Sequence, residues 1–191
     1  MVTSRVLYLG FLALIAFERG VELLLSRRNA RQARAAGAVE SGRGHYPVMV
    51  VFHSLFLVSC AAEVLLVPRS FPGALGWAAL GLALLAQGLR YWAVVSLGAR
   101  WNTRVLVWPG VPPVTSGPYR FLRHPNYLAV VVEMLAVPLV YGAWVTAVVF
   151  SLGNLFLLSV RIRSEERALG PSWDKAFTGR KRLLPELHRG K

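Results

Sequence analysis

The fold is decided by residues 127–160, which read YLAVVVEMLAVPLVYGAWVTAVVFSLGNLFLLSV. This stretch holds two apolar segments, Tyr127–Tyr141 and Ala143–Val160, with little more than Gly142 between them. A glycine permits the tight turn that such a connection needs. Two apolar helices joined this closely must run antiparallel. We therefore predict a helical hairpin whose two ends return to the same membrane face, whether it crosses fully or enters from one side.

Three longer apolar segments precede the hairpin, and they are Val6–Leu25, Pro47–Val67 and Ala74–Ser96. Each is long enough to cross about 30 Å of hydrocarbon as a helix. Apolar residues make up 55% of the 191 residues and charged residues only 16%, against about a quarter in a soluble domain, and the apolar residues fall in long uninterrupted runs. We predict an all-α membrane protein with about five transmembrane helices, the last two forming the tight hairpin.

The basic residues lie unevenly along the chain, which has a net charge of +13. Arg19 and Arg90 lie within spans, and Arg5 and Arg69 lie at one end of them. All other Lys and Arg residues follow the first, third or fifth segment. The positive-inside rule places these connections in the cytoplasm and the N-terminus outside. We expect a multi-pass protein of the cell membrane whose active site, if it has one, faces the cytoplasm.

Composition also disfavours several classes of function. The basic residues are separated by apolar runs and form no single basic surface, so nucleic-acid binding is a poor fit. The single cysteine, Cys60, lies in an apolar run and can form neither an internal disulfide nor a cysteine metal site. No His and Glu spacing fits a metal centre, and we interpret His53 as a hydrogen-bonded packing residue. We predict no metal.

Ionisable residues inside the predicted spans need a reason, because each costs several kcal/mol in hydrocarbon. Two interpretations stay open: interhelical ion pairs, such as Glu18 or Glu22 with Arg90, or a polar wall around a cavity. Glu63 lies near the end of its span, where snorkelling to the interface explains it. The residues concerned inside the spans are Glu18, Arg19, Glu22, Gln87, Arg90 and Glu133.

Residues 101–127 differ from the rest, and they read WNTRVLVWPGVPPVTSGPYRFLRHPNY. Five prolines forbid a continuous helix here, and a loop of this length in a compact protein is usually functional or disordered. Its aromatic and apolar content argues against disorder. After the hairpin, residues 161–169 read RIRSEERAL and should continue the fifth helix into the cytoplasm. Arg161 and Glu165 are then one helical turn apart on one face, while Glu166 points elsewhere.

These two motifs together resemble the isoprenylcysteine carboxyl methyltransferase superfamily. The pattern GPYRFLRHPNY, an apolar hairpin and then R-x-x-x-E-E-x-x-L is similar to these membrane enzymes, which use S-adenosylmethionine. Residues 18–53 and 89–110 also resemble a bacterial subfamily found beside type III polyketide synthases. That subfamily methylates alkylpyrones and related phenolic lipids.

The resemblance implies a cofactor site that joins the two motifs. Arg161 is implied to face the acceptor, and Arg161, Glu165 and His124 are the implied catalytic residues. Trp173 and Phe177 stand where the family commonly has tyrosines, so contacts made by those hydroxyls are not expected here. The implied cofactor-binding residues are Val111, Val114, Tyr119, His124, Pro125, Asn126, Tyr127 and Glu165.

The implied activity is S-adenosylmethionine-dependent O-methylation of a lipophilic acceptor, such as an alkylpyrone or related polyketide lipid. A hydroxypyrone enol is already anionic, so the fixed cation of Arg161 would suffice to position it. A phenol, with a pKa near 10, needs base assistance, and His124 or Glu165 would supply it. We expect one integral-membrane domain over residues 1–191, with three spans in 1–96 and the cofactor-binding catalytic part in 97–191.

Other functions stay open at this point. The acceptor could instead be an isoprenylcysteine carboxylate or another lipid, such as a phospholipid amine. A small membrane transporter or scaffold would also use charges within its spans. The expected partners are a lipophilic small molecule and membrane lipid, with no nucleic acid and no obligatory protein partner.

Overall fold

The computed structural model describes residues 2–42 and 44–183 of the chain. Two short 3-10 helices, Gly98–Arg100 and Gly117–Arg120, lie in the connection between α3 and α4. A small antiparallel sheet pairs β1 (Val39–Ser41) with β2 (Val105–Val107), which the sequence did not lead us to predict. The five α-helices are α1 (Val2–Ala35), α2 (His45–Leu66), α3 (Ala74–Leu97), α4 (Pro125–Leu139) and α5 (Trp144–Ala176).

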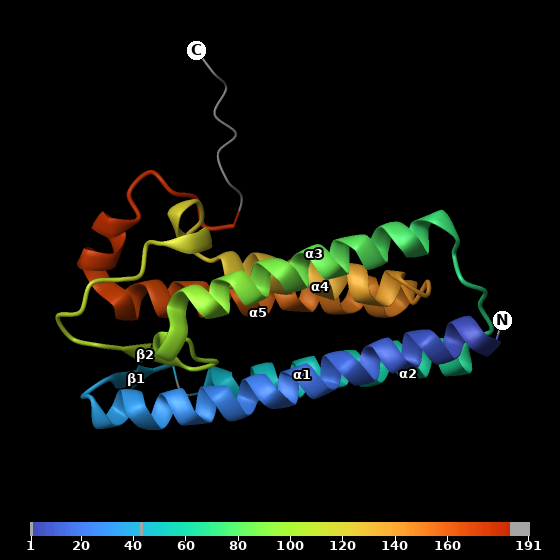
Figure 1. The fold of residues 1–191 in the computed structure, drawn as a ribbon, viewed down its shortest axis with the longest axis horizontal. Coiled ribbons are helices and arrows are strands. Elements are labelled where there is room, and N and C mark those ends of the chain that lie inside the picture. Colours follow the sequence, from blue (N-terminus) through green and yellow to red (C-terminus); the bar gives the residue numbers. More distant parts are fainter. Residues whose placement is uncertain (1, 43, 184–191) are drawn as a thin grey trace, which may run out of the picture.

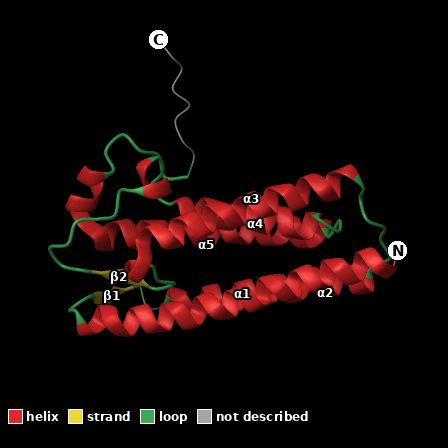
Figure 2. Cartoon of the chain, in the orientation of Figure 1, coloured by secondary structure: helices red, strands yellow, loops and turns green. Residues whose placement is uncertain are grey.

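The helices form two layers (Figure 1). α1 and α2 lie side by side in one layer, and α3, α4 and α5 form the other, where α4 contacts both α3 and α5. Figure 2 shows that the strands and long loops gather at one end of the molecule, which we call the loop end. The α4–α5 turn lies at the opposite end, which we call the turn end.

Three helices, α2, α3 and α5, are long and apolar enough to cross a membrane. No more than 33% of the apolar window of any of them is buried inside the protein, so most of each window is available to lipid. α4 is apolar but has only 15 residues, and α1 is long but carries charges at mid-length. The prediction of an all-α membrane protein is confirmed, and three of its five spans meet the length and composition that crossing requires.

α1 is longer than predicted. Its apolar segment ends at Leu25, but the helix continues to Ala35, so the prediction of a loop over residues 26–35 was wrong. This stretch is rich in Ala, Arg and Gln, which are good helix formers without being apolar. The helix then ends before Gly37, whose φ of +83° suits the left-handed position after a helix. Arg43, Arg189 and Lys191, which entered the charge prediction, lie outside the described residues.

α3 packs on α4 along a face of small residues. Small residues let helices approach closely in a lipid environment. At the turn end this contact requires a glycine, because a Cβ on Gly76 would lie 2.8 Å from the carbonyl oxygen of Val140 and 2.6 Å from the ring of Phe71. The buried residues of α3 are Gly76, Ala79, Ala83, Ala86, Arg90 and Ala93.

The predicted hairpin is confirmed, with α4 and α5 joined through Gly142 at a φ of +71°. Glu63 of α2 contacts the turn end of this hairpin. The carboxylate accepts hydrogen bonds from the backbone N–H groups of Val145 (3.2 Å) and Thr146 (2.8 Å), and it pairs with Arg69 at 3.0 Å. Glu63 therefore caps the unpaired N–H groups at the start of α5, and the snorkelling explanation was wrong.

Candidate active site

A cavity of about 920 Å³ lies between the two helix layers, near the upper end of the size range of small-molecule sites. All five helices, β2 and the proline-rich loop contribute to its wall. Among the residues predicted from sequence, only Pro125 does not line it. Pro125 instead starts α4, where its fixed φ and missing N–H fit the first turn. Those that line it are Val111, Val114, Tyr119, His124, Asn126, Tyr127, Arg161 and Glu165.

Arg161, Tyr127 and Glu165 form one hydrogen-bonded chain on the cavity wall. Arg161 Nε donates to the Tyr127 hydroxyl at 2.7 Å, and that hydroxyl donates to the Glu165 carboxylate. Arg161 Nη2 also donates to the carbonyl oxygen of Thr103 at 2.5 Å. Arg161 as a whole is only 9% exposed, so the structure fixes a cation at this point of the wall, with a carboxylate one helical turn away.

His124 is held from outside the cavity by a second carboxylate. Its Nε2 lies 3.2 Å from Glu166 Oε1, and Arg182 pairs with the same carboxylate at 2.5 Å. The spacing predicted that Glu166 would point away from Arg161 and Glu165, and sequence reasoning gave it no role. The Glu-Glu pair of the motif was the available signal, because adjacent helical residues face different neighbours.

Residues 180–183, which we call the strap, run across the loop that carries His124. The backbone N–H groups of Arg123 and His124 donate to the carbonyl oxygens of Lys181 and Arg182, both at 3.0 Å. Arg180 Nη1 donates to the carbonyl oxygen of Tyr119 at 2.9 Å. The hydrogen bond from Arg182 to Glu166 and the charge of that carboxylate raise the pKa of the guanidinium. The strap thus holds two turns from one side: the turn that carries Tyr119 and the turn that carries His124.

An aromatic wall follows His124 around the loop end of the cavity. The His124 ring lies 5.2 Å from the Tyr127 ring and 5.3 Å from the Trp173 ring, centroid to centroid. Phe177 packs on Trp173 at 4.7 Å and is 1% exposed. The two positions that depart from the family pattern therefore serve as apolar packing, and Trp173 also lines the cavity.

The turn that carries Tyr119 depends on Gly117. Its φ of +57° is a left-handed conformation that glycine adopts readily. A Cβ there would lie 2.0 Å from Ser96 Oγ, so the turn lies directly against α3. Burial, aided by the charge of Glu165, raises the pKa of the Tyr119 phenol. Tyr119 is therefore a neutral hydrogen-bonding group at physiological pH.

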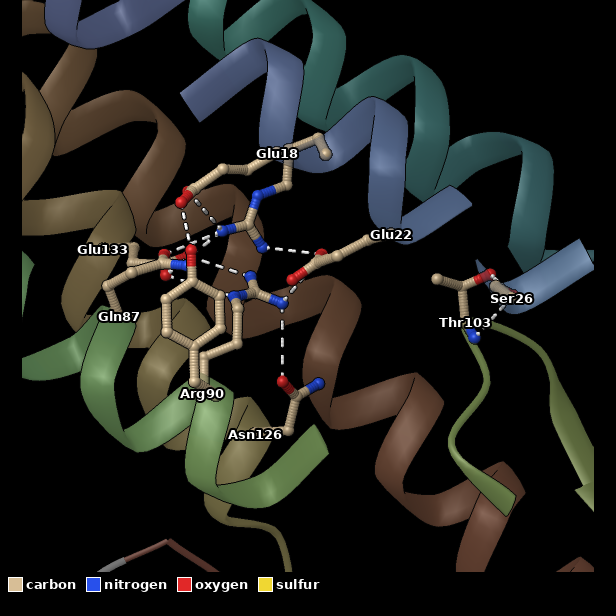
Figure 3. A network of polar contacts seen from close by, with 10 residues as sticks. Glu18, Glu22, Ser26, Gln87, Arg90, Thr103, Asn126 and Glu133 are labelled. Atoms are coloured by element: carbon tan, nitrogen blue, oxygen red, sulfur yellow. Dashed lines mark hydrogen bonds and ion pairs between the residues drawn. The ribbon is translucent and has the colours of Figure 1, made fainter. Parts of the chain in front are cut away.

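The opposite end of the cavity reaches the ionisable residues inside the spans (Figure 3). Glu22 pairs with Arg90 at 3.6 Å, as one of the two sequence interpretations predicted, whereas Glu18 contacts Tyr91 and Arg19. Glu22 and Arg90 also line the cavity, so the second interpretation, a polar wall around a cavity, holds as well. The same two residues form the interhelical ion pair and the polar wall.

The contacts that join α1 to the site loop were not predicted. Ser26 Oγ lies 2.7 Å from Thr103 Oγ1, and Asn29 Nδ2 donates to the carbonyl oxygen of Trp101 at 2.8 Å. Ser26 and Asn29 are buried. They lie in the part of α1 that was taken for a loop, so no signal in the sequence pointed to them. Within the described residues, no three His, Cys, Asp or Glu side chains are grouped to hold a metal ion.

Comparison with known proteins gives a family match and two similar chains. Residues 79–171 match the Isoprenylcysteine carboxyl methyltransferase (ICMT) family. The chain is 44% identical over 158 residues to the "Uncharacterized protein YpbQ" of Bacillus subtilis (strain 168), covering 83% of this chain and 94% of that protein. It is 27% identical over 161 residues to an "Uncharacterized protein" of Haemophilus influenzae, covering 83% and 92%.

Three helices apolar enough to cross a membrane surround one large cavity together with α1 and α4, and both motifs lie on its wall. The chain belongs to the isoprenylcysteine carboxyl methyltransferase family. Members of this family are membrane methyltransferases that use S-adenosylmethionine, and this protein is a membrane methyltransferase.

Proposed function

We propose that this protein is an S-adenosylmethionine-dependent O-methyltransferase whose acceptor is lipophilic, such as an alkylpyrone or a related polyketide lipid. One observation carries the proposal: a single cavity is lined by the motif residues at one end and by apolar side chains of α1 and α2 along its length. A polar cofactor and a lipophilic acceptor can therefore meet inside one cavity, as methyl transfer requires.

The chemistry of the loop end fits the cofactor. Glu165 offers a carboxylate to a cationic or hydroxyl-bearing ligand, and Tyr127 and Trp173 add aromatic surface to the same end of the cavity. The proline-rich loop near Val111 and Val114 offers backbone hydrogen-bonding groups. When bound, S-adenosylmethionine supplies an electrophilic methyl group to the acceptor oxygen.

Three residues of the chain then act on the acceptor. Arg161 orients an anionic oxygen, because its guanidinium is buried and held by Tyr127 and Thr103. If the acceptor is a phenol, His124 or Glu165 takes the hydroxyl proton as the new oxygen–carbon bond forms.

We propose that the loop end faces the cytoplasm, with the N-terminus outside. The basic last turns of α1, the connection after α3 and the end of α5 all lie at the loop end (Figure 1), which supports this orientation. Ala16 and Gly20 of α1 and Ser54 and Val58 of α2 line the cavity and are exposed. The gap beside them would admit the alkyl chain from the bilayer.

We also propose that residues 1–191 act as one domain. The N-terminal part supplies Arg19, Glu22 and His53 to the same cavity that the C-terminal motifs line. Neither part alone would enclose a ligand.

The test begins with the purified full chain in detergent. S-adenosylhomocysteine should raise its thermal midpoint, since a ligand that binds only the folded state stabilises it. Incubation with S-adenosylmethionine and a long-chain alkylpyrone should then give a product heavier by one methylene unit. Parallel reactions with an isoprenylcysteine and with phosphatidylethanolamine separate the alternative acceptors. A transporter or scaffold predicts no stabilisation and no product in any reaction.

A further inference from the structure

The last turns of α1, residues 26–35, have one buried side and one basic side. The buried residues follow the three- and four-residue spacing of one side of a helix, and they are Ser26, Asn29, Ala30 and Ala33. Arg27, Arg28 and Arg31 of the same turns are exposed, and we call these three residues the basic face. Figure 1 shows that this part of α1 lies at the loop end of the molecule.

The described residues provide no anion for the basic face. Among the residues that the structure describes, its three guanidinium groups make no hydrogen bond or ion pair. The next arginine along α1, Arg34, pairs with Glu40 at 2.5 Å, and Arg104 binds the same carboxylate at 2.7 Å. A guanidinium stays charged and carries a fork of N–H donors that fits a phosphate group. The basic face therefore offers three charges and their donors to an anion from outside this part of the chain.

The basic face continues a stripe of α1 that is apolar and exposed. Large apolar residues recur along the helix at intervals of three and four and are 50–69% exposed, and they are Leu14, Phe17, Val21 and Leu24. Arg28 and Arg31 take the next two places of this spacing and are exposed as well. An exposed apolar stripe on a membrane protein faces the acyl chains of lipid. The change from Leu24 to Arg28 therefore marks the height at which hydrocarbon ends and headgroups begin.

The lengths of two helices agree with this height. Trp144 begins α5 at the turn end and is 46% exposed, as tryptophans at a membrane interface are. From Trp144 to Arg163 the helix rises about 28 Å, and from Arg5 to Arg28 α1 rises about 35 Å. Both rises are close to the thickness of the hydrocarbon layer, about 30 Å. The basic face therefore lies beside the lipid headgroups when the turn end lies at the other surface of the membrane.

We propose that the basic face binds the phosphate groups of anionic phospholipids, and that this contact restrains the end of α1 that holds the active-site loop. The proposal goes beyond methyl transfer, because it assigns a binding surface whose residues do not line the cavity. Each basic residue beside a negatively charged membrane surface strengthens binding by about fivefold. A soluble polyanion is the weaker fit, because the basic face is continuous with the apolar stripe that lipid covers.

The buried side of the same turns holds the loop that positions Arg161. Ser26 Oγ accepts a hydrogen bond from the backbone N–H of Thr103 at 3.0 Å, and Asn102 Nδ2 donates to the Ser26 carbonyl oxygen at 3.0 Å. Figure 3 shows Ser26 beside Thr103, whose carbonyl oxygen accepts a hydrogen bond from Arg161 at 2.5 Å. Lipid on one side of these turns and the loop on the other contact one short piece of helix, so lipid binding steadies the loop.

The experiment adds phosphatidylglycerol to the full-length protein in mixed micelles of phosphatidylcholine and a nonionic detergent. The thermal midpoint should rise and then level off, because a lipid that binds only the folded state stabilises it. Hydrogen exchange at the backbone amides of residues 101–107 should slow over the same range of lipid content. Phosphatidylcholine alone should produce neither change.

The triple variant Arg27→Gln, Arg28→Gln and Arg31→Gln should need about 10- to 100-fold more phosphatidylglycerol for half of the rise, because it loses three contributions of about fivefold each. The matched control is the triple variant with lysine at the same positions, which keeps the charges and should stay close to the unaltered protein. If the triple glutamine variant does not fold, Arg28→Gln alone should need about fivefold more lipid.

Equal responses to the two lipids in the unaltered protein, or the same phosphatidylglycerol curve in the glutamine variants, would overturn the proposal. A rise of the midpoint with no slowing of exchange at residues 101–107 would overturn the link to the active-site loop. If polyuridylic acid raised the midpoint through the three arginines and phosphatidylglycerol did not, the partner would be a soluble polyanion and the lipid proposal would be wrong. Neither measurement needs the methyl acceptor, so each outcome is independent of the proposed function.

Discussion

The α4–α5 pair is built in opposite ways at its two ends. At the turn end, Gly142, Gly76 and the Glu63 cap bring the helices into close contact, and Tyr141 is almost fully buried. At the loop end the same two helices line a large cavity, and they meet there through polar side chains, since Tyr127 of α4 hydrogen-bonds to Arg161 and Glu165 of α5. The comparison teaches that stability and chemistry are supplied by different ends of one hairpin.

This division gives each end its own response to substitution. Changes at the turn end should lower stability and leave ligand affinity unaltered, because no cavity-lining residue lies there. Changes at the loop end should alter ligand affinity with little cost in stability, because the cavity is already open. The following four experiments test the division, from the largest expected effect to the smallest.

Glu165→Ala should weaken binding of S-adenosylhomocysteine by about 10- to 100-fold, because it removes a charged hydrogen-bond acceptor from the cavity wall. The thermal midpoint without ligand should change little. Isothermal calorimetry and a thermal scan measure the two quantities, and Glu165→Gln, which keeps an oxygen for the Tyr127 hydroxyl, is the control. Normal affinity in the Ala variant would remove Glu165 from the cofactor site.

Gly76→Ala should destabilise the protein by about 1–3 kcal/mol, because the new methyl group overlaps Val140 and Phe71. This lowers the thermal midpoint by several degrees for a chain of this size. Gly81→Ala is the matched control on the same helix, since nothing lies within 4 Å of its added Cβ. A loss of cofactor affinity in the stable fraction of Gly76→Ala would mean that the two ends are coupled.

Glu63→Gln should cost about 1 kcal/mol, because the neutral amide keeps one acceptor but loses the charge that faces the α5 N-terminus and Arg69. Thermal unfolding in detergent measures the loss. Methylation rates at a temperature well below the midpoint should match those of the unaltered protein. If the midpoint does not move, the cap contributes nothing and the turn alone holds this end.

Acid should weaken the join between α1 and the sheet. Burial acts to raise the pKa of Glu40, but the hydrogen bonds from Arg104 and Arg34 outweigh it, so the pKa of this carboxyl is lowered. Its contribution to stability is therefore present above the ordinary glutamate pKa of about 4.3 and is lost as pH falls through the lowered value. We expect Glu40 to contribute under 1 kcal/mol to the free energy of unfolding, about the size of an exposed ion pair. Thermal midpoints measured from pH 7 to pH 3 should fall less steeply for Glu40→Gln than for the unaltered protein, and parallel curves would contradict this.

The sequence predicted the helices and the hairpin because apolar runs and a single glycine decide them locally. It also grouped His124 and Tyr127 with Arg161 and Glu165, although only through resemblance, since two motifs whose residues are 34 to 41 positions apart give no local signal of contact. Where helix propensity and hydrophobicity disagree, as in residues 26–35, the apolar pattern alone gave the wrong boundary.

Contacts that depend on tertiary structure could not be predicted. Glu63 looks like a residue near the interface until Thr146 is placed beside it. Glu166 and Arg182 are 16 residues apart, and only the turn after α5 brings them together. The cavity itself follows from how the two helix layers diverge, which no single segment encodes.

The strap has a consequence for biosynthesis. The backbone carbonyls of Lys181 and Arg182 anchor the turn that carries His124, yet the ribosome makes them after the five described α-helices. Until these two residues leave the exit tunnel, the nascent chain lacks the backbone acceptors that position that turn. The site can therefore be completed only after the helices that surround the cavity have been made.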